Sequence, residues 1–203
     1  FLAKRAFRDP QGEAIVEPAT GRRLTYREFD DRCNRIANAL LDLGVSAGER
    51  VGVLLMNSVE FLETFFACGK IGAVCVPLNW RLVPDELEFI LNDSGTTLLV
   101  FGSEFAATAA ELRSRRTEIR HWIQVRGAAA SVESFALDYD ELTAAAGDAE
   151  LPLGDTDAGL SDAVREIVLA DRLLHLRQLD LLLRGLVKRW RPLAQDGHLV
   201  RRD

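Results

Sequence analysis

The chain has 203 residues, enough for one domain of good size or for one domain with an appendage. Its residues are 48% apolar and 28% charged, the composition of a packed water-soluble protein. A net charge of −6 argues against nucleic acid as a partner, and no apolar run reaches the roughly 18 residues that span a bilayer.

The first elements predicted in chain order are a hairpin and a long helix. Residues 13–18 and 22–26 are short β-like runs on either side of a Thr-Gly turn. Thr25 and the glutamate three residues later are spaced as a capping box, and apolar residues then recur at helical spacing. Gly44 is placed to end this helix in the left-handed conformation.

Strands and helices then alternate. Residues 50–56 form a continuous apolar run, which is typical of a strand buried on both faces. A second buried strand is predicted at 73–78, and further strands at 96–101 and 121–126, with helices that begin near Ser58, Pro84 and Ser103. A loop at 127–134 and a short helix at 139–146 follow. This alternation predicts an α/β fold with βαβ layers and a mostly parallel sheet.

Three cysteines stand in apolar contexts and have no CxxC spacing. Cys33, Cys68 and Cys75 are therefore expected to be buried, reduced thiols of a cytoplasmic protein, with no metal site. We expect no signal peptide, and because the chain opens at Phe1 rather than Met, we expect that a native N-terminus is missing.

The run from Ser94 to Thr97 has the residue types of a phosphate-binding loop. Such a loop leads from a strand through a glycine turn into a helix, so that the amide N–H groups face the anion. Here the order is reversed, because a helix precedes Gly95 and a strand follows it, and no lysine is near. The run is predicted to be a helix stop that leads into a strand.

Residues 23–101 carry a linked set of motifs. LTY stands before a long helix ending in LG, and GERVGVLLMNSVEF, GAVCVPLNWRL and DELEFILNDSG follow in that order. The set resembles the N-terminal region of the adenylate-forming acyl-CoA synthetases, the AMP-binding ligase superfamily. Trp80 stands where proline is common in the family, and Val83 where a capping threonine is common. The resemblance implies a partial acyl-CoA synthetase N-terminal domain.

The resemblance also implies a chemistry that depends on residues further along the family's chain. Its members use ATP and magnesium to turn a carboxylic acid into an acyl-adenylate, and then transfer the acyl group to coenzyme A. The family needs a phosphate loop ending in Pro-Lys-Gly, a Thr-Glu pair, an aspartate for the ribose and a C-terminal lysine.

The family's phosphate loop follows an acidic stretch similar to LPLGDTDAG at 151–159. Here no Pro-Lys-Gly follows that stretch, and the only later lysine is Lys188. We therefore expect this chain alone to hold no catalytic residue, no metal and no bound cofactor, whereas ATP, magnesium and CoA belong to the intact family.

The composition changes near the same point. Residues 1–159 carry 16 basic and 25 acidic side chains, whereas residues 160–203 carry 9 and 6. We divide the chain into a partial AMP-binding domain at 1–155 and a divergent, Leu/Arg-rich helical tail at 156–203. A truncated, internally deleted or frame-shifted gene would produce such a tail.

The remaining groups of acidic and basic residues are expected to be solvated at the surface. The paired acids are predicted to be solvated, on helix faces or near caps, and the basic residues to mark a helix C-terminus rather than an anion site. The acids are Asp30-Asp31, Asp85-Glu86 and Asp138-Asp140-Glu141, and the basic residues are Arg113, Arg115, Arg116 and Arg120. Trp80 and Arg81 follow the C-terminal end of a strand, where open α/β sheets build sites. These two residues are the candidates for ligand contact.

Three hypotheses about function follow. The first is an N-terminal fragment of an acyl-CoA synthetase, an AMP-forming acid–thiol ligase of fatty or other carboxylic acids, without activity of its own. The second is a non-catalytic interaction module that pairs with a full-length relative or another subunit through an exposed sheet edge or the tail. In the third, the missing enzyme portion is supplied in trans. None of them involves nucleic acid or a transmembrane segment.

Overall fold

The structure is a computed structural model that describes residues 2–18, 20–115, 118–127 and 131–151. Its helices are α1 (Leu2–Arg8), α2 (Tyr26–Asp42), α3 (Val59–Ile71), α4 (Pro84–Ser94), the 3-10 turn η1 (Ser103–Phe105), α5 (Ala106–Arg115) and α6 (Tyr139–Ala145). Its strands are β1 (Glu13–Glu17), β2 (Arg22–Thr25), β3 (Arg50–Leu54), β4 (Val74–Pro77), β5 (Leu98–Gly102), β6 (His121–Val125) and β7 (Leu137–Asp138). The described chain is thus a hairpin followed by alternating strands and helices.

Strands β3 to β7 form one parallel sheet in the order β4-β3-β5-β6-β7, and β1 and β2 form the separate antiparallel hairpin. The chain passes from β3 outward to β4 and then returns to place β5 on the other side of β3. The strand order therefore reverses between β3 and β5, whose residues are almost all buried. The predicted α/β class with a parallel sheet is confirmed, although the sequence did not reveal β7.

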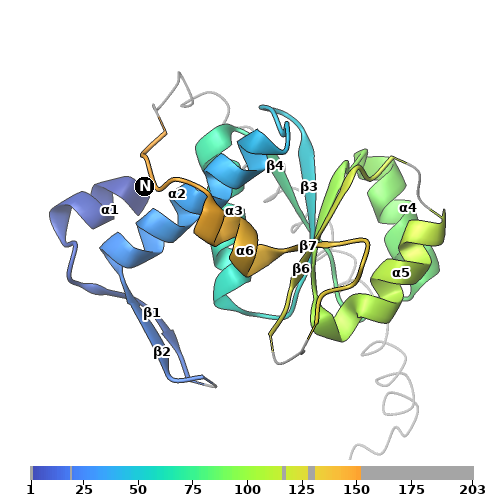
Figure 1. The fold of residues 1–203 in the computed structure, drawn as a ribbon, viewed down its shortest axis with the longest axis horizontal. Helices are drawn as coiled ribbons and strands as arrows, with labels where there is room; N and C mark the ends of the chain where they lie inside the picture. The colour runs from blue at the N-terminus through green and yellow to red at the C-terminus, as the bar shows by residue number, and fades with distance from the viewer. Residues whose placement is uncertain (1, 19, 116–117, 128–130, 152–203) are drawn as a thin grey trace, which may run out of the picture. The chain divides into compact units, whose positions relative to one another are not determined.

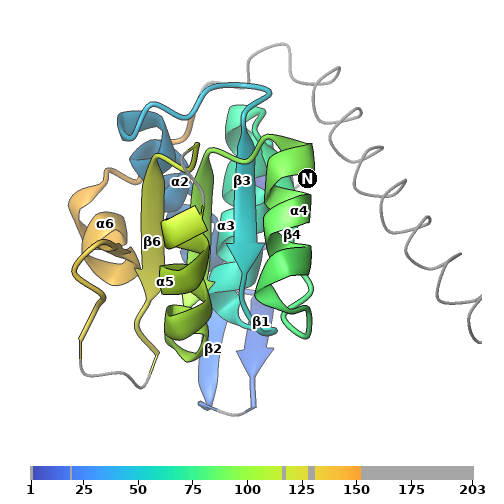
Figure 2. The same cartoon turned by 90° about the vertical axis from the view of Figure 1, so that its right-hand side faces the viewer.

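Helices cover both faces of this sheet (Figures 1 and 2). Helices α2, α3 and α6 lie on one face, and α4 and α5 lie on the other. Because successive side chains of a strand point to opposite faces, each buried strand supplies apolar groups to both layers. This arrangement explains why the central strands read as unbroken apolar runs.

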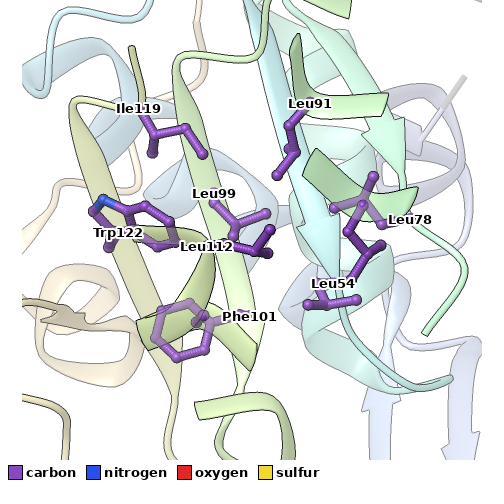
Figure 3. Close-up of a cluster of buried hydrophobic side chains, with 10 residues drawn as sticks. Leu54, Leu78, Leu91, Leu99, Phe101, Leu112, Ile119 and Trp122 are labelled. Carbon is purple, nitrogen blue, oxygen red and sulfur yellow. The ribbon is translucent and has the colours of Figure 1, made fainter. Parts of the chain in front are cut away.

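The core between the sheet and the pair α4 and α5 consists of interleaved leucines and aromatic rings (Figure 3). Phe101 and Trp122 meet edge to face, with ring centroids 6.4 Å apart. Full burial of one such apolar side chain contributes about 1.5–3 kcal/mol. The ten buried members are Leu54, Leu78, Leu87, Leu91, Leu99, Phe101, Ala109, Leu112, Ile119 and Trp122.

Helix α2 is the element on which the other face is assembled. Its capping box forms as predicted, because the Thr25 hydroxyl accepts the Glu28 N–H at 3.2 Å and the Glu28 carboxylate accepts the Thr25 N–H at 2.8 Å. Gly44, with φ of 83°, adopts the predicted left-handed conformation just past the helix end. Further along, Tyr139 and Leu142 of α6 face the apolar side of α2.

Two element predictions were wrong in detail, and one helix was missed. Strand β4 was expected to be a buried strand, but it is an edge strand that pairs only with β3 among the described strands, and of its four residues only Cys75 is buried. Ser103 was expected to cap a helix, but it opens the 3-10 turn η1 and α5 starts at Ala106. Helix α1 was not foreseen, because its seven residues give too short a pattern to recognise.

Candidate functional site

The run from Ser94 to Thr97 ends helix α4. Gly95 has φ of 64° and ψ of 36°, and its N–H donates to the Asn92 carbonyl at 3.1 Å. The Thr96 N–H donates to the Leu91 carbonyl at 3.0 Å, which closes the last turn. The predicted helix stop is confirmed.

The hydroxyl groups of this run are engaged as well. The Ser94 hydroxyl bonds the Ile90 carbonyl at 2.7 Å and lies 2.8 Å from the hydroxyl oxygen of Thr96, which is fully buried. No amide in the turn is aimed outward from a helix N-terminus, as an anion requires. These residues therefore do not fit the phosphates of a nucleoside triphosphate or its magnesium ion.

Trp80 and Arg81 lie in the loop after β4, at the carboxyl edge of the sheet. The Arg81 guanidinium carbon stands 4.4 Å from the centroid of the Trp80 ring, which is 38% exposed. The Arg81 N–H donates to the Asn79 side-chain oxygen at 3.0 Å, which orders the turn. The two predicted residues thus meet in a cation–π pair that is open to solvent, and their role as ligand contacts stays a prediction.

A hollow of about 370 Å³ opens between the hairpin and the first turn of α3. Asn57 and Ser58 in its lining belong to the loop that follows β3, one of the two strands between which the strand order reverses. Its lining is mostly apolar, and the Ser58 hydroxyl in it accepts the Phe61 N–H at 3.2 Å to cap α3. The lining residues are Ile15, Val16, Glu17, Pro18, Asn57, Ser58, Val59, Phe61 and Leu62. The sequence did not reveal this hollow, because it joins segments some forty residues apart.

A buried carboxylate ties the α2 layer together. Glu63 has no exposed surface, and it receives hydrogen bonds from Arg32, one of them at 3.3 Å, and from the Tyr139 hydroxyl at 3.0 Å. Arg22 of the hairpin adds an ion pair at 3.5 Å. Burial, and then the charge of Glu63, raise the pKa of Tyr139 well above its ordinary value. Since every partner is engaged within the protein, the cluster is structural rather than a proton-transfer site.

The paired acids divide between surface and interior. Asp85 and Glu86 are exposed in the first turn of α4, as predicted. Asp30 was expected to be solvated, but it is 7% exposed and pairs with Lys70 at 2.8 Å. Asp138 was also expected to be solvated, but it is buried as the N-cap of α6. The prediction failed for these two because their partners come from other elements.

Asp138 joins two elements by its two oxygens. One oxygen accepts the N–H groups of Asp140 at 2.8 Å and Glu141 at 3.1 Å, and the other accepts the Arg126 guanidinium, with Nε at 2.8 Å. Burial opposes ionisation, but the Arg126 hydrogen bond and these amide groups hold the pKa of Asp138 below its ordinary value. Asp138 is therefore held in its ionised form while it caps α6.

The basic residues near the end of α5 are paired within the chain. Arg115 contacts Asp85 and lies 2.5 Å from a Glu111 oxygen. The Arg113 guanidinium carbon stands 4.9 Å from the Phe135 ring centroid. Arg120 pairs with Glu49, and Arg116 lies outside the described residues. The predicted basic helix C-terminus is confirmed.

The three cysteines are buried and unbridged, as expected. Burial raises the pKa of Cys33, and a hydrogen bond with Cys75, together with burial, raises that of Cys68. Within the described ranges, no cluster of three or more His, Cys, Asp or Glu side chains has the arrangement of a metal site. No helix of the described chain is long and apolar enough to cross a membrane.

Comparison with known proteins links these features to a family. The sequence profile of the family described as "AMP-binding enzyme" matches residues 2–161. The long-chain-fatty-acid–CoA ligase FadD13 of Mycobacterium tuberculosis is 38% identical over 141 residues, which cover 68% of this chain and 28% of that protein.

Solved structures show the same relation. A fatty acyl CoA synthetase of Mycobacterium tuberculosis superposes with a TM-score of 0.67 at 33% identity, covering 75% of this chain and 29% of that one. The anthranilate CoA ligase AuaEII in complex with anthranoyl-AMP gives a TM-score of 0.70 at 27% identity, covering 75% and 28%.

The chain therefore spans less than a third of the length of these relatives. The predicted boundary at residue 155 and the predicted helical tail lie outside the described residues. The resemblance inferred from the LTY, GERVGVLLMNSVEF and GAVCVPLNWRL motifs is confirmed by both kinds of comparison. The chain belongs to the family of AMP-binding enzymes.

Proposed function

We propose that these 203 residues are the N-terminal part of an acyl-CoA synthetase-like ligase and do not form an acyl-adenylate by themselves. The observation that carries this proposal is the run from Ser94 to Thr97. It has the letters of a phosphate loop, yet its amides and hydroxyls close the end of α4. The sequence offers no Pro-Lys-Gly to replace it.

In the complete ligase, ATP and magnesium would activate a carboxylic acid and CoA would accept the acyl group. The part described here would contribute the parallel sheet and its carboxyl edge, with Trp80 and Arg81 as ligand contacts. The relatives' names cover a long-chain fatty acid and anthranilate, so the proposal extends to a carboxylic acid and no further. We place the protein in the cytoplasm, in keeping with its three free thiols.

The test is calorimetric titration of the purified 203-residue chain with MgATP, together with a pyrophosphate-release assay on palmitate and anthranilate. FadD13 serves as the positive control, because it is related and longer. We expect neither heat of binding nor pyrophosphate from the short chain. Adenylate formation would refute the proposal, and Thr96→Val would then be the first variant to make.

The interaction-module hypothesis requires an edge to which another chain can pair. Strand β4 has four residues and ends at Pro77, which lacks an N–H donor, and β7 has two residues. Short edges and edge prolines discourage strand addition. This weighs against pairing through the sheet. Light scattering after size exclusion tests it, since a dimer mass at micromolar concentration would favour the module.

A further inference from the structure

The segment that leaves α6, residues 146–149, is held against α2 by polar side chains and is called the strap. The Arg35 guanidinium supplies two of the contacts. Its Nη1 donates to the Ala146 carbonyl at 2.9 Å, and its Nη2 pairs with the Asp148 carboxylate at 2.8 Å. One side chain therefore grips both the backbone and a side chain of the strap.

Asn38, one turn further along α2, supplies the other two contacts. Its amide nitrogen donates to the Gly147 carbonyl at 2.9 Å and to the Ala149 carbonyl at 3.2 Å. Three of the four acceptors are thus main-chain oxygens. We call Arg35 and Asn38 the clasp. Because the clasp binds mainly main-chain oxygens, its contacts depend on the backbone path of the strap more than on the identity of its side chains.

The strap is attached almost entirely by these polar contacts. Residues 147–150 are exposed, so no apolar burial adds to the attachment beyond Ala146, which is 8% exposed. Exposed hydrogen bonds and ion pairs contribute little each, and segments held in this way open at a small fraction of the global free energy of unfolding.

A like charge on α2 opposes the attachment. Burial, then the charges of Asp148 and Asp30, raise the pKa of Asp31, while Arg27 and Arg35 lower it. Asp31 precedes Arg35 by four positions, one turn of α2, so it lies on the same side of the helix as the guanidinium that binds Asp148, and its charge opposes that of Asp148. The strap lies between an attraction, from the clasp, and a repulsion, from Asp31.

We propose that the strap is a releasable connection, which Arg35 and Asn38 close and Asp31 opens, while the sheet and α6 stay folded. Helix α6 has its own anchor, because its Tyr139 donates to the buried Glu63. Opening therefore changes the path of the chain after residue 145 without loss of the core. This inference does not depend on the proposed ligase function.

Limited proteolysis of the full 203-residue chain tests it, with the rate of cleavage after Glu150 by a glutamate-specific protease as the readout. The test variant is Arg35→Ala/Asn38→Ala, and the control is Arg27→Ala, on the same helix without a contact to the strap. We expect cleavage after Glu150 to rise roughly ten-fold in the double variant only, while hydrogen–deuterium exchange of β3 and β5, which reports on the core, stays unchanged.

Asp31→Asn supplies the opposite arm. Removing the repulsion should slow opening by about two-fold at low salt, and the difference should shrink at high salt. If Asp31 had no effect on the strap, Asp31→Asn would leave the rate of opening unchanged. The proposal is overturned if the clasp variant leaves cleavage after Glu150 unchanged, if the exchange of β3 and β5 rises as well, or if Asp31→Asn speeds cleavage.

Discussion

The buried carboxylate of Glu63 gives the sharpest test of what holds the α2 layer together. Glu63→Ala would remove the acceptor of Arg32 and of the Tyr139 hydroxyl, whereas Arg22 would keep its ion pair with Glu60. Deleting one partner of a fully buried ion pair costs about 3–5 kcal/mol. Because the two arginine side chains remain 28% exposed, water satisfies them in part, and we expect about 3 kcal/mol.

Urea unfolding followed by tryptophan fluorescence measures this loss, since Trp122 is 5% exposed and reports on the core. In a chain of this size the change corresponds to a melting temperature lower by about 6–12 °C. Glu60→Ala is the matched control. Glu60 lies on the same helix and makes one ion pair, to Arg22 at 2.7 Å, so its loss should cost about 1 kcal/mol or less.

The conservative variant Glu63→Gln separates charge from hydrogen bonding. It keeps an acceptor for Tyr139 but removes the charge that Arg32 requires, so it should fall between Glu63→Ala and the wild type. If Glu63→Ala and Glu60→Ala lose the same stability within about 0.5 kcal/mol, the idea that burial makes the Glu63 cluster costly to break is refuted.

Three further outcomes are expected. Gly95→Ala should destabilise the chain by about 1–2 kcal/mol in urea unfolding, because φ of 64° strains any residue with a Cβ, whereas Gly147→Ala, which meets open space, should cost less. Asp138→Asn keeps an N-cap for α6 but loses the charge that Arg126 binds, so at pH 7 it should cost less than the roughly 0.5–2 kcal/mol of removing the cap altogether. Because the folded pKa of Asp138 lies below 3.8, its contribution is present above that pH and fades as the pH falls through the folded value, so wild type and variant should converge in acid. Dithionitrobenzoate should find no rapidly reacting thiol in the native chain and three after denaturation, since all three cysteines are buried; a fast native reaction would contradict the packing of α2 and α3.

The features that the sequence predicted well are those set by neighbours along the chain. The capping box at Thr25, the left-handed stops at Gly44 and Gly95, and the alternation of strands with helices all depend on residues a few positions apart. The prediction that 94–97 is a helix stop rather than a phosphate loop also rested on a local feature, the order of helix, glycine and strand.

The features that it missed depend on strand order and on distant partners. A strand's own residues do not say whether it lies in the centre or at the edge, which is why β4 was misplaced. Asp30 was predicted to lie on the surface, because its partner Lys70 is too distant in sequence to be inferred from local spacing. Glu63 and Tyr139 are 76 positions apart, so their contact is invisible to any pattern of helical spacing.

The covering of α2 by α6 sets an order of events during synthesis. The apolar residues Ile36, Ala39 and Leu40 face Tyr139 and Leu142, and Arg35 meets Asp148, which lies 113 positions later. At the usual pace of translation, α2 leaves the ribosome on the order of 5–20 s before the helix that covers it. During that interval this part of the apolar stripe of α2 lacks the cover that α6 provides. The docking of α6, the last helix to be made in the described chain, therefore completes the burial of this face of α2.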